Sequence, residues 1–391
     1  MEPRTGSRVF AMVAGEDSGD QLGAELIEAL RANHPDAKFV GVGGPRMRTA
    51  GLDAWHDIAE LSVMGLAEVL RHLPRLLQLR ASLARRLIAL RPTVFIGIDA
   101  PDFNFGLEKR LKRTGIPTVH YVSPSIWAWR EGRAEKIGQS TDSVLCLFPM
   151  EPPLYAKHGV NARFVGHPLA DRFPLVPDRE AARRELGLDS DAPVLAVLPG
   201  SRLSEIHRLG ATFLNASRRV AAEIPNLQIV IPAANPQCRA ALEKLQRDPG
   251  PVLVDGHAHR AMVAADVVLL ASGTAALEAT LAKRPMVVGY RIASLTHALV
   301  KGLGMLKTNV YALPNVLAGK MLVPELMQHD CTPEKLADAV IKLFRDTNHR
   351  DELMHEFERM HLALHKGGGA AASAARAIEQ VVAVRNGTAT P

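Results

Sequence analysis

The stretch Asp266-Val267-Val268-Leu269-Leu270-Ala271-Ser272-Gly273-Thr274-Ala275-Ala276-Leu277-Glu278 joins an apolar run to the start of a helical pattern. The run through Ala271 is typical of a buried parallel strand, and the residues after Gly273 predict a helix through Leu281. A strand, a small-residue turn and a helix start bring unpaired N–H groups and the positive end of a helix dipole to one point, which suits a phosphate. The alternative is an ordinary strand–helix turn capped by Ser or Thr, because short glycine-containing motifs often match by chance.

The composition indicates a globular protein with anionic partners. A chain of 391 residues predicts two or three domains, and a net charge of +6 favours nucleic acid, phosphorylated substrates or acidic lipid. Aromatic residues make up only 5% of the chain, which argues against stacking platforms for single-stranded nucleic acid. We therefore expect no nucleic-acid partner.

The cysteines are few and scattered, at positions 146, 238 and 331. This pattern argues for a reducing compartment and against disulfides or a zinc site, and we expect no metal and no cofactor. No apolar run reaches the ~18 residues that span a bilayer, and Met1-Glu2-Pro3-Arg4 does not resemble a signal peptide. We expect a cytoplasmic protein.

Short apolar runs alternate with helical patterns along the chain, which predicts an α/β fold with parallel sheets. Helices are expected at Gln21–Ala32 and Leu107–Thr114. The expected strands are Arg8–Ala14, Lys38–Val42, Thr93–Ile98, Thr118–Val122, Ser143–Phe148, Val194–Leu198, Gln228–Pro232, Val252–Val254, Val267–Leu270 and Met286–Tyr290. A proline-rich stretch from Gly166 to Pro177 marks a boundary near residue 170. The expected architecture is two Rossmann-like domains facing across a cleft, residues 1–170 and 171–350, followed by C-terminal helices and a tail over 351–391.

The second half contains further phosphate-type features at predicted strand ends. Gly200 and Ser201 can present backbone N–H groups, and Arg202 supplies a guanidinium for phosphate oxygens. The Pro285–Arg291 stretch places a cation at another strand end, and the Leu313–Gly319 stretch places the Asn315 amide at a turn. Glu278, about one turn into its helix, is placed to accept hydrogen bonds from ribose hydroxyls. Together these features predict that residues 171–350 bind a nucleotide diphosphate.

The loop after the first predicted strand is acidic. Its glycines fall at every fourth residue from Gly15, which differs from the dinucleotide fingerprint. Glu16, Asp17 and Asp20 suit sugar hydroxyls or an acceptor amine better than a bare pyrophosphate. The alternative is helix capping by Ser18 or Asp20, and capping and ligand contact can coexist.

Asp99 directly follows the predicted strand Thr93–Ile98, and Asp102 follows Pro101. A carboxylate at the carboxyl end of a buried parallel strand lies where such sheets bind ligands, so Asp99 is the candidate general base. Capping and loop closure are the alternative for both, and Asp102 suits that alternative better.

The loop Tyr121–Arg130 carries Trp127 and Trp129 beside a cluster of cations that includes Arg130. An exposed loop of this kind can line a sugar or acyl-chain site. Alternatively, the two tryptophans seal the core of the domain.

The Leu66–Arg91 stretch combines an apolar stripe with six arginines and no acid from Val69 onward. The spacing predicts an amphipathic helix, which Pro74 can break or kink. A face of one charge sign indicates a membrane-surface element, with a solvated cationic helix as the alternative. The expected membrane contacts are Leu66, Val69, Leu70, Leu73, Leu76 and Leu77.

These segments resemble the lipid-A-disaccharide synthase family, inverting B-type glycosyltransferases of lipopolysaccharide biosynthesis, over nearly the whole chain. The segments that carry the resemblance are Ala14–Asp20, Gly44–Met47, Val63–Gly65, Gly97–Asn104, Tyr121–Arg130, Leu198–Arg202, Ala271–Glu278, Pro285–Arg291 and Leu313–Gly319. Asp17 departs from the family, which usually has Ala there.

The resemblance implies transfer from UDP-2,3-diacylglucosamine to 2,3-diacylglucosamine 1-phosphate, giving a β-1,6-linked disaccharide and UDP. Asp99 would be the general base. The donor would be bound by Gly200, Ser201, Arg202, Ser272, Gly273, Thr274, Ala275, Glu278 and Asn315. The acceptor sugar would contact Glu16, Ser18, Asp102 and Arg130. The helix with the leucine stripe would hold the protein on the cytoplasmic face of the inner membrane. In this family the C-terminal helices can cross back to the first domain or exchange in a dimer, so a monomer and a homodimer both remain open.

Two other functions fit the same fold. A UDP-sugar 2-epimerase or hydrolase would act on a soluble sugar and have no use for the Leu66–Arg91 stripe. A non-catalytic nucleotide-sugar or lipid-binding protein would have no need of Asp99 at a strand end.

Overall fold

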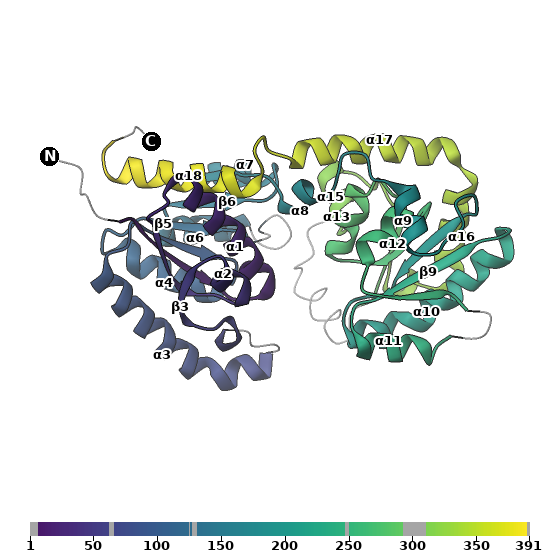
Figure 1. The fold of residues 1–391 in the computed structure, drawn as a ribbon, viewed down its shortest axis with the longest axis horizontal. Helices are drawn as coiled ribbons and strands as arrows, with labels where there is room; N and C mark the ends of the chain where they lie inside the picture. The colour runs from purple at the N-terminus through teal and green to yellow at the C-terminus, as the bar shows by residue number, and fades with distance from the viewer. Residues whose placement is uncertain are drawn as a thin grey trace. The chain divides into compact units, whose positions relative to one another are not determined.

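The computed structural model describes residues 7–61, 66–124, 126, 131–246, 250–291 and 310–388, without the side chains of 66–71 and 131. The chain forms two compact units (Figure 1), one of Met1–Asp171 with Leu364–Pro391 and one of Arg172–Ala363. The expected boundary near residue 170 lies beside this division. Residues 351–391, expected as a separate C-terminal region, are instead shared between the two units.

The first unit is built on a seven-stranded parallel sheet in the order β3-β2-β1-β4-β5-β6-β7. Its strands are β1 (Val9–Ala14), β2 (Lys38–Val42), β3 (Leu52–His56), β4 (Val94–Ile98), β5 (Thr118–Tyr121), β6 (Ser143–Cys146) and β7 (Ala162–Phe164). The chain passes from β1 outward to β3 and then returns to β4, which pairs with β1 on the other side. The strand order therefore reverses between β1 and β4.

Helices cover both faces of this sheet because alternate residues of each buried strand point to opposite sides. Phe10 and Met12 share one hydrophobic core with α1, α2 and α18, whereas Ala11 and Val13 share the other with α3 and α4 (Figure 1). The helices of this unit include α1 (Asp17–Asn33), α2 (Pro45–Thr49), α3 (Leu66–Leu90), α4 (Pro101–Lys112), α6 (Ala134–Ser140), α7 (Glu151–Ala156) and α18 (Ala370–Arg385), with α8 (Pro168–Arg172) at the boundary.

The second unit is built on a six-stranded parallel sheet in the order β10-β9-β8-β11-β12-β13, which reverses between β8 and β11. Its strands are β8 (Val194–Leu198), β9 (Gln228–Ala233), β10 (Val252–Asp255), β11 (Val267–Ala271), β12 (Met286–Tyr290) and β13 (Glu325–Met327). Its helices include α9 (Arg179–Glu185), α10 (Leu203–Glu223), α11 (Pro236–Glu243), α12 (Ala258–Ala264), α13 (Thr274–Leu281), α15 (Leu313–Ala318), α16 (Pro333–Arg345) and α17 (Thr347–Leu364). Helix α10 packs against α16, and α9 packs against α12.

The strand predictions are confirmed for the buried strands, within one or two residues at each end. The predictions missed β3, β7 and β13, each of which lies at the edge of its sheet. Nearly all residues of these strands are half-buried or exposed, so they lack the continuous apolar run that marks the central strands.

Helix α3 runs without interruption from Leu66 to Leu90, so the expected break at Pro74 does not occur. Pro74 lies within the helix, where an exposed side chain on a surface turn is tolerated at the loss of one hydrogen bond. Of the helices in the described parts of the chain, none is both long and apolar enough to cross a bilayer.

Helix α18 is part of the core of the first unit, where it packs against α1. The buried Ile378 lies in the same hydrophobic cluster as Leu26 and Leu30. We expect Ile378→Ala to lower the free energy of unfolding of this unit by about 2–5 kcal/mol, because it leaves a cavity in the core. Urea unfolding of the full chain measures this loss. The exposed Arg376→Ala is the control, expected within about 0.5 kcal/mol of wild type, and equal stabilities of the two variants would show that α18 is not part of the core.

Candidate active site

The phosphate-type loops of the second unit follow the two strands between which its sheet order reverses. Leu198 ends β8 beside Leu270 of β11, so the loop 199–202 and the turn 272–273 leave the same edge of the sheet as neighbours. In parallel α/β sheets this reversal point is where ligands bind, beyond the carboxyl ends of the strands. Gly200–Arg202 and Ser272–Ala275, the segments predicted to bind phosphate, thus lie at the edge of the sheet where such folds bind ligands.

The side chain of Glu205, in the first turn of α10, binds backbone N–H groups of the loop 199–202. Its Oε2 accepts hydrogen bonds from the backbone N–H of Ser201 (2.9 Å) and of Arg202 (3.2 Å), which caps α10. The expectation that the Ser201 N–H is free for a phosphate is therefore corrected. What this loop offers to a ligand is the exposed side chains of Ser201 and Arg202.

The turn after β11 leads into a helix start that no side chain caps. The Ser272 N–H donates to the Gly289 oxygen at 3.3 Å, so the N–H groups that can face a ligand are those that follow Ser272. Helix α13 begins at Thr274 after Gly273, and no side chain caps it. Gly273 and Thr274 are exposed, and Glu278 is half-buried one turn further along. Burial raises the pKa of the Glu278 carboxyl, and Arg172 acts in the opposite direction. This geometry suits an anion at the helix start with a carboxylate beside it.

Asn315 has a structural role. It is fully buried; its Oδ1 accepts from the N–H groups of Leu322 and Val323, and its Nδ2 donates to Val323 O and Glu325 Oε1. These bonds hold the turn around α15 to the strand β13. In this structure these bonds use the donors and acceptor of its amide, and the expected contact of Asn315 with the diphosphate stays a prediction.

In the first unit, the loops after β1 and β4 meet at the corresponding reversal point. A Cβ on Gly15 would lie 2.5 Å from the Cβ of Ala100, so only glycine allows the two loops to approach this closely. Glu16 and Ser18 are exposed there, and Ser18 does not cap α1. Asp20, in contrast, is buried and accepts from three N–H groups at the start of α2, which is a structural role.

Asp99 is half-buried directly after β4, at the same reversal point. Asp99 and Ala100 both have left-handed backbones, with φ of 51° and 44°. Such conformations cost about 1–2 kcal/mol each for residues other than glycine and are concentrated at functional sites. Asp102 is exposed in the first turn of α4. The structure thus brings Glu16, Ser18, Asp99 and Asp102 to one edge of the sheet, whereas Arg130, Trp127 and Trp129 lie outside the described residues.

A buried polar cluster that the sequence did not reveal follows the next two strands. Val122, which directly follows β5, has a φ of 83°, and the Ser123 hydroxyl lies 3.0 Å from the Tyr155 hydroxyl. Glu151 is 1% exposed, accepts from the Phe148 N–H at 3.1 Å and leaves its Oε1 without a hydrogen bond in the described structure. Burial raises the pKa of Glu151 to about 7, against the hydrogen bonds from Phe148 and Ser123.

The apolar stripe of α3 has two parts. Leu79, Leu83 and Leu87 are buried in the core, whereas Leu73 and Leu77 are 42% and 45% exposed. Leu76 is half-buried, and the side chains of Leu66, Val69 and Leu70 lie outside the described residues. The N-terminal half of the described stripe is therefore uncovered within its own unit.

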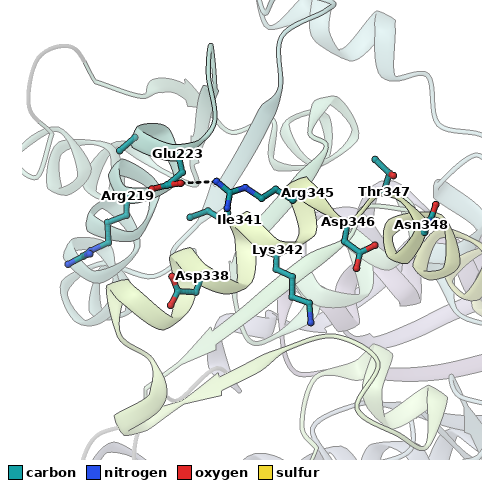
Figure 2. A pocket seen from close by; sticks show the side chains of 10 residues that line it. Arg219, Glu223, Asp338, Ile341, Lys342, Arg345, Asp346, Thr347 and Asn348 are labelled. Atoms are coloured by element: carbon teal, nitrogen blue, oxygen red, sulfur yellow. Dashed lines mark hydrogen bonds and ion pairs between the residues drawn. The ribbon is translucent and has the colours of Figure 1, made fainter.

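A groove of about 890 Å³ on the second unit lies away from these loops (Figure 2). It is formed where α10 and α16 end, and Glu223 and Arg345 form an ion pair in it at 2.7 Å. Helices that follow parallel strands end at the amino edge of the sheet, so this groove is opposite to the phosphate-type loops. No group of three or more potential metal ligands is found within the described ranges.

Solved structures with this fold include enzymes that act on nucleotide sugars. A putative UDP-N-acetylglucosamine 2-epimerase from Listeria monocytogenes has a TM-score of 0.65 at 12% identity over 99% of both chains. The calicheamicin glycosyltransferase has a TM-score of 0.59 at 17% identity over 98% of this chain and 100% of that one. Identities this low show the fold alone. The chain has the two Rossmann-like domains of the GT-B fold, which glycosyltransferases and epimerases share.

Sequence relatives identify the family. Residues 10–379 match the family model described as lipid-A-disaccharide synthetase. The lipid-A-disaccharide synthase of Xanthomonas campestris pv. campestris is 58% identical over 96% of this chain and 86% of its own length. The lipid-A-disaccharide synthase of Xylella fastidiosa is 55% identical over 96% of this chain and 98% of its own length. The chain belongs to the lipid-A-disaccharide synthetase family, and it is a glycosyltransferase that forms the lipid A disaccharide. The epimerase and binding-protein alternatives are not favoured.

Glu151 should make stability depend on pH. The folded chain keeps the Glu151 proton up to a pH of about 7, whereas the unfolded chain loses it near 4.5, so wild type loses stability as the pH rises between these values. Glu151→Gln removes this dependence, and we expect its stability relative to wild type to rise by about 3 kcal/mol from pH 4.5 to pH 8. Urea unfolding across this range measures it. The exposed Glu28→Gln is the control, and parallel curves for wild type and Glu151→Gln would contradict the prediction.

Proposed function

We propose that the chain transfers a 2,3-diacylglucosamine unit from UDP-2,3-diacylglucosamine to the 6-hydroxyl of 2,3-diacylglucosamine 1-phosphate. The products are the β-1,6-linked tetraacyl disaccharide phosphate and UDP. Family membership supports these substrates. The observation that carries the mechanism is Asp99, a half-buried carboxylate at the reversal point of the first sheet.

Asp99 acts as the general base in this proposal. Its carboxylate accepts the proton of the acceptor 6-hydroxyl as that oxygen attacks the anomeric carbon of the donor. The bond between the anomeric carbon and the UDP oxygen breaks on the opposite side, and UDP leaves with the electron pair. Attack opposite to the leaving group inverts the α-linked donor to a β-linked product.

The second unit stabilises the departing diphosphate. Backbone N–H groups at the start of α13, over Gly273–Ala275, point toward an anion placed at that helix end, and Ser272 contributes its hydroxyl. The exposed guanidinium of Arg202 adds a fixed positive charge, with the Ser201 hydroxyl and Gly200 beside it. Glu278 accepts from the ribose hydroxyls, and its ionised form is fully present only above its raised pKa.

The first unit binds the acceptor sugar. Glu16 and Ser18 after β1 and Asp102 in the first turn of α4 are exposed around Asp99. Their oxygens accept hydrogen bonds from sugar hydroxyls and from the acceptor amides. Arg130 remains a proposed acceptor contact.

The exposed leucines of α3 bind the membrane surface from which both acylated substrates are drawn. Leu73 and Leu77 present apolar side chains on the helix that also carries the exposed Arg75 and Arg85. Leucines that enter the acyl boundary and arginines that meet anionic headgroups are the two contributions to interfacial binding. The proposed location is the cytoplasmic face of the inner membrane.

Asp99→Asn tests the catalytic assignment. We expect kcat to fall by about 10²–10⁴-fold, because the amide cannot accept the proton, while the dissociation constant for UDP stays unchanged. The measurement is turnover with both lipid substrates, together with calorimetric binding of UDP. Asp53→Asn removes an exposed carboxylate from β3 of the same sheet and is expected to retain activity. Full turnover by Asp99→Asn would show that Asp99 is not the base.

Leu73→Ser/Leu77→Ser tests the membrane assignment. We expect the double variant to bind anionic phospholipid vesicles at least tenfold more weakly, because each leucine contributes about 1.5–3 kcal/mol when fully buried. Co-sedimentation measures vesicle binding, and UDP binding should not change. Leu175→Ser/Leu362→Ser is the control, because these leucines are similarly exposed in the second unit. Equal vesicle binding by wild type and the α3 variant would exclude this surface as the anchor.

A further inference from the structure

We propose that Asn104 is a positioning residue for Asp99, which its side-chain amide holds in the orientation that general-base catalysis requires. The inference rests on the proposed function, in which Asp99 is the base. Asn104 lies in the second turn of α4 and is fully buried, so it does not touch either substrate.

One amide group of Asn104 connects the two strands that flank the reversal point. Its Nδ2 donates to the backbone oxygen of Asp99 at 2.8 Å and to that of Val13 at 3.2 Å. Val13 belongs to β1, and Asp99 directly follows β4. The Oδ1 of Asn104 makes no hydrogen bond in the described structure. The two donated bonds are therefore the reason that this position needs an amide.

The bond to Asp99 opposes backbone strain. Asp99 and Ala100 both adopt left-handed conformations, which persist only where surrounding contacts enforce them. The Asp99 N–H donates to the Tyr121 oxygen at 2.9 Å, and the Asp99 oxygen accepts from Asn104. Both peptide groups that flank the Asp99 Cα are thus anchored. The direction in which the carboxylate leaves the backbone is fixed from both sides.

Gly97 allows α4 to come close enough for this contact. A Cβ at Gly97 would lie 2.2 Å from Oε1 of Glu108 and 2.9 Å from the Cβ of Asn104. Glu108 is also buried, and its Oε1 lies 2.7 Å from Nδ1 of His120 on β5. Any larger residue at position 97 would push α4 away from the sheet and move the Asn104 amide from both carbonyl oxygens.

Loss of the Asn104 amide should lower the rate of proton transfer, because this step is sensitive to the position of the base. A base displaced by about 1 Å can lose about 10²-fold in rate while its substrates still bind. Asn104→Leu keeps nearly the same shape and removes both donors. We expect kcat to fall about 10- to 100-fold, with KM for both substrates and the UDP dissociation constant within about twofold of wild type.

Thr141→Val is the matched control. The buried Thr141 hydroxyl lies 3.1 Å and 3.2 Å from the backbone oxygens of Thr118 and Ser143, at the amino edge of the same sheet. The Thr141→Val variant loses a comparable buried hydrogen bond at the edge of the sheet opposite to Asp99. We therefore expect lower thermal stability and an unchanged kcat. A fall in kcat as large as that of Asn104→Leu would overturn the proposal, because lost stability alone would then explain both.

A double-mutant cycle with Asp99→Asn distinguishes the positioning role from the base assignment. If Asn104 acts through Asp99, Asn104→Leu should lower the residual rate of Asp99→Asn by less than about twofold. An equal fold-loss in both backgrounds would overturn the positioning role and leave the base assignment intact. Full turnover by Asp99→Asn alone would instead overturn the proposed base and this inference with it.

Asn104→Ser covers the case in which the leucine variant does not fold. The serine side chain is shorter than that of asparagine but keeps one hydrogen-bond donor. We therefore expect a kcat between those of wild type and Asp99→Asn, with KM unchanged. A serine variant with wild-type kcat and lowered thermal stability would show that the amide stabilises the fold without positioning the base.

Discussion

The reversal of strand order in each parallel sheet determines where the candidate site loops of each unit lie. At β1 and β4 in the first unit, and at β8 and β11 in the second, consecutive connections leave toward opposite sides of the sheet. The loops that follow these strands are therefore not covered by a crossover helix, and their backbone groups remain accessible beyond the strand ends. Each unit places its candidate ligand residues at this one point. In the first unit these are carboxylates and a hydroxyl, and in the second they are N–H groups at a helix start with a guanidinium.

The two reversal points differ in how they are held, and this difference matches the proposed chemistry. A diphosphate is attracted by positive electrostatic potential, which does not depend on the exact direction of one side chain. The uncapped start of α13 and an exposed arginine can supply this potential. A general base needs a defined direction, and the first unit accepts the cost of two adjacent left-handed residues to provide it. The amide of Asn104 and the carbonyl oxygen of Tyr121 then hold that conformation. Asp99 and Arg202, which the sequence made easy to notice, are half-buried and exposed, whereas Asn104, which holds Asp99, is fully buried.

The sequence predicted the central strands because each is a short, continuous apolar run, and it placed Asp99, Arg202 and Ser272–Ala275 at strand ends for the same reason. It missed three edge strands, β3, β7 and β13, which are short and half-exposed. It offered Asp20 a structural role only as a cap of its own helix, and it did not reveal the bonds that Asn315 makes. The partners of both residues lie on separate elements that only the fold brings together. Glu205 was only partly accessible to prediction, because the N-cap three residues before it is Arg202 and not the Ser or Thr of the usual capping-box signal. Nothing local marks Glu151, whose burial comes from tertiary packing.

We propose that the chain transfers a sugar between two acylated glucosamines. The direct measurement is to incubate the purified protein, with EDTA present, with UDP-2,3-diacylglucosamine and 2,3-diacylglucosamine 1-phosphate, and to follow UDP and lipid products by mass spectrometry. We expect release of UDP only when the acceptor is present, together with the mass of the tetraacyl disaccharide phosphate. Release of UDP without acceptor, or no release from a protein that binds UDP, would contradict this proposal.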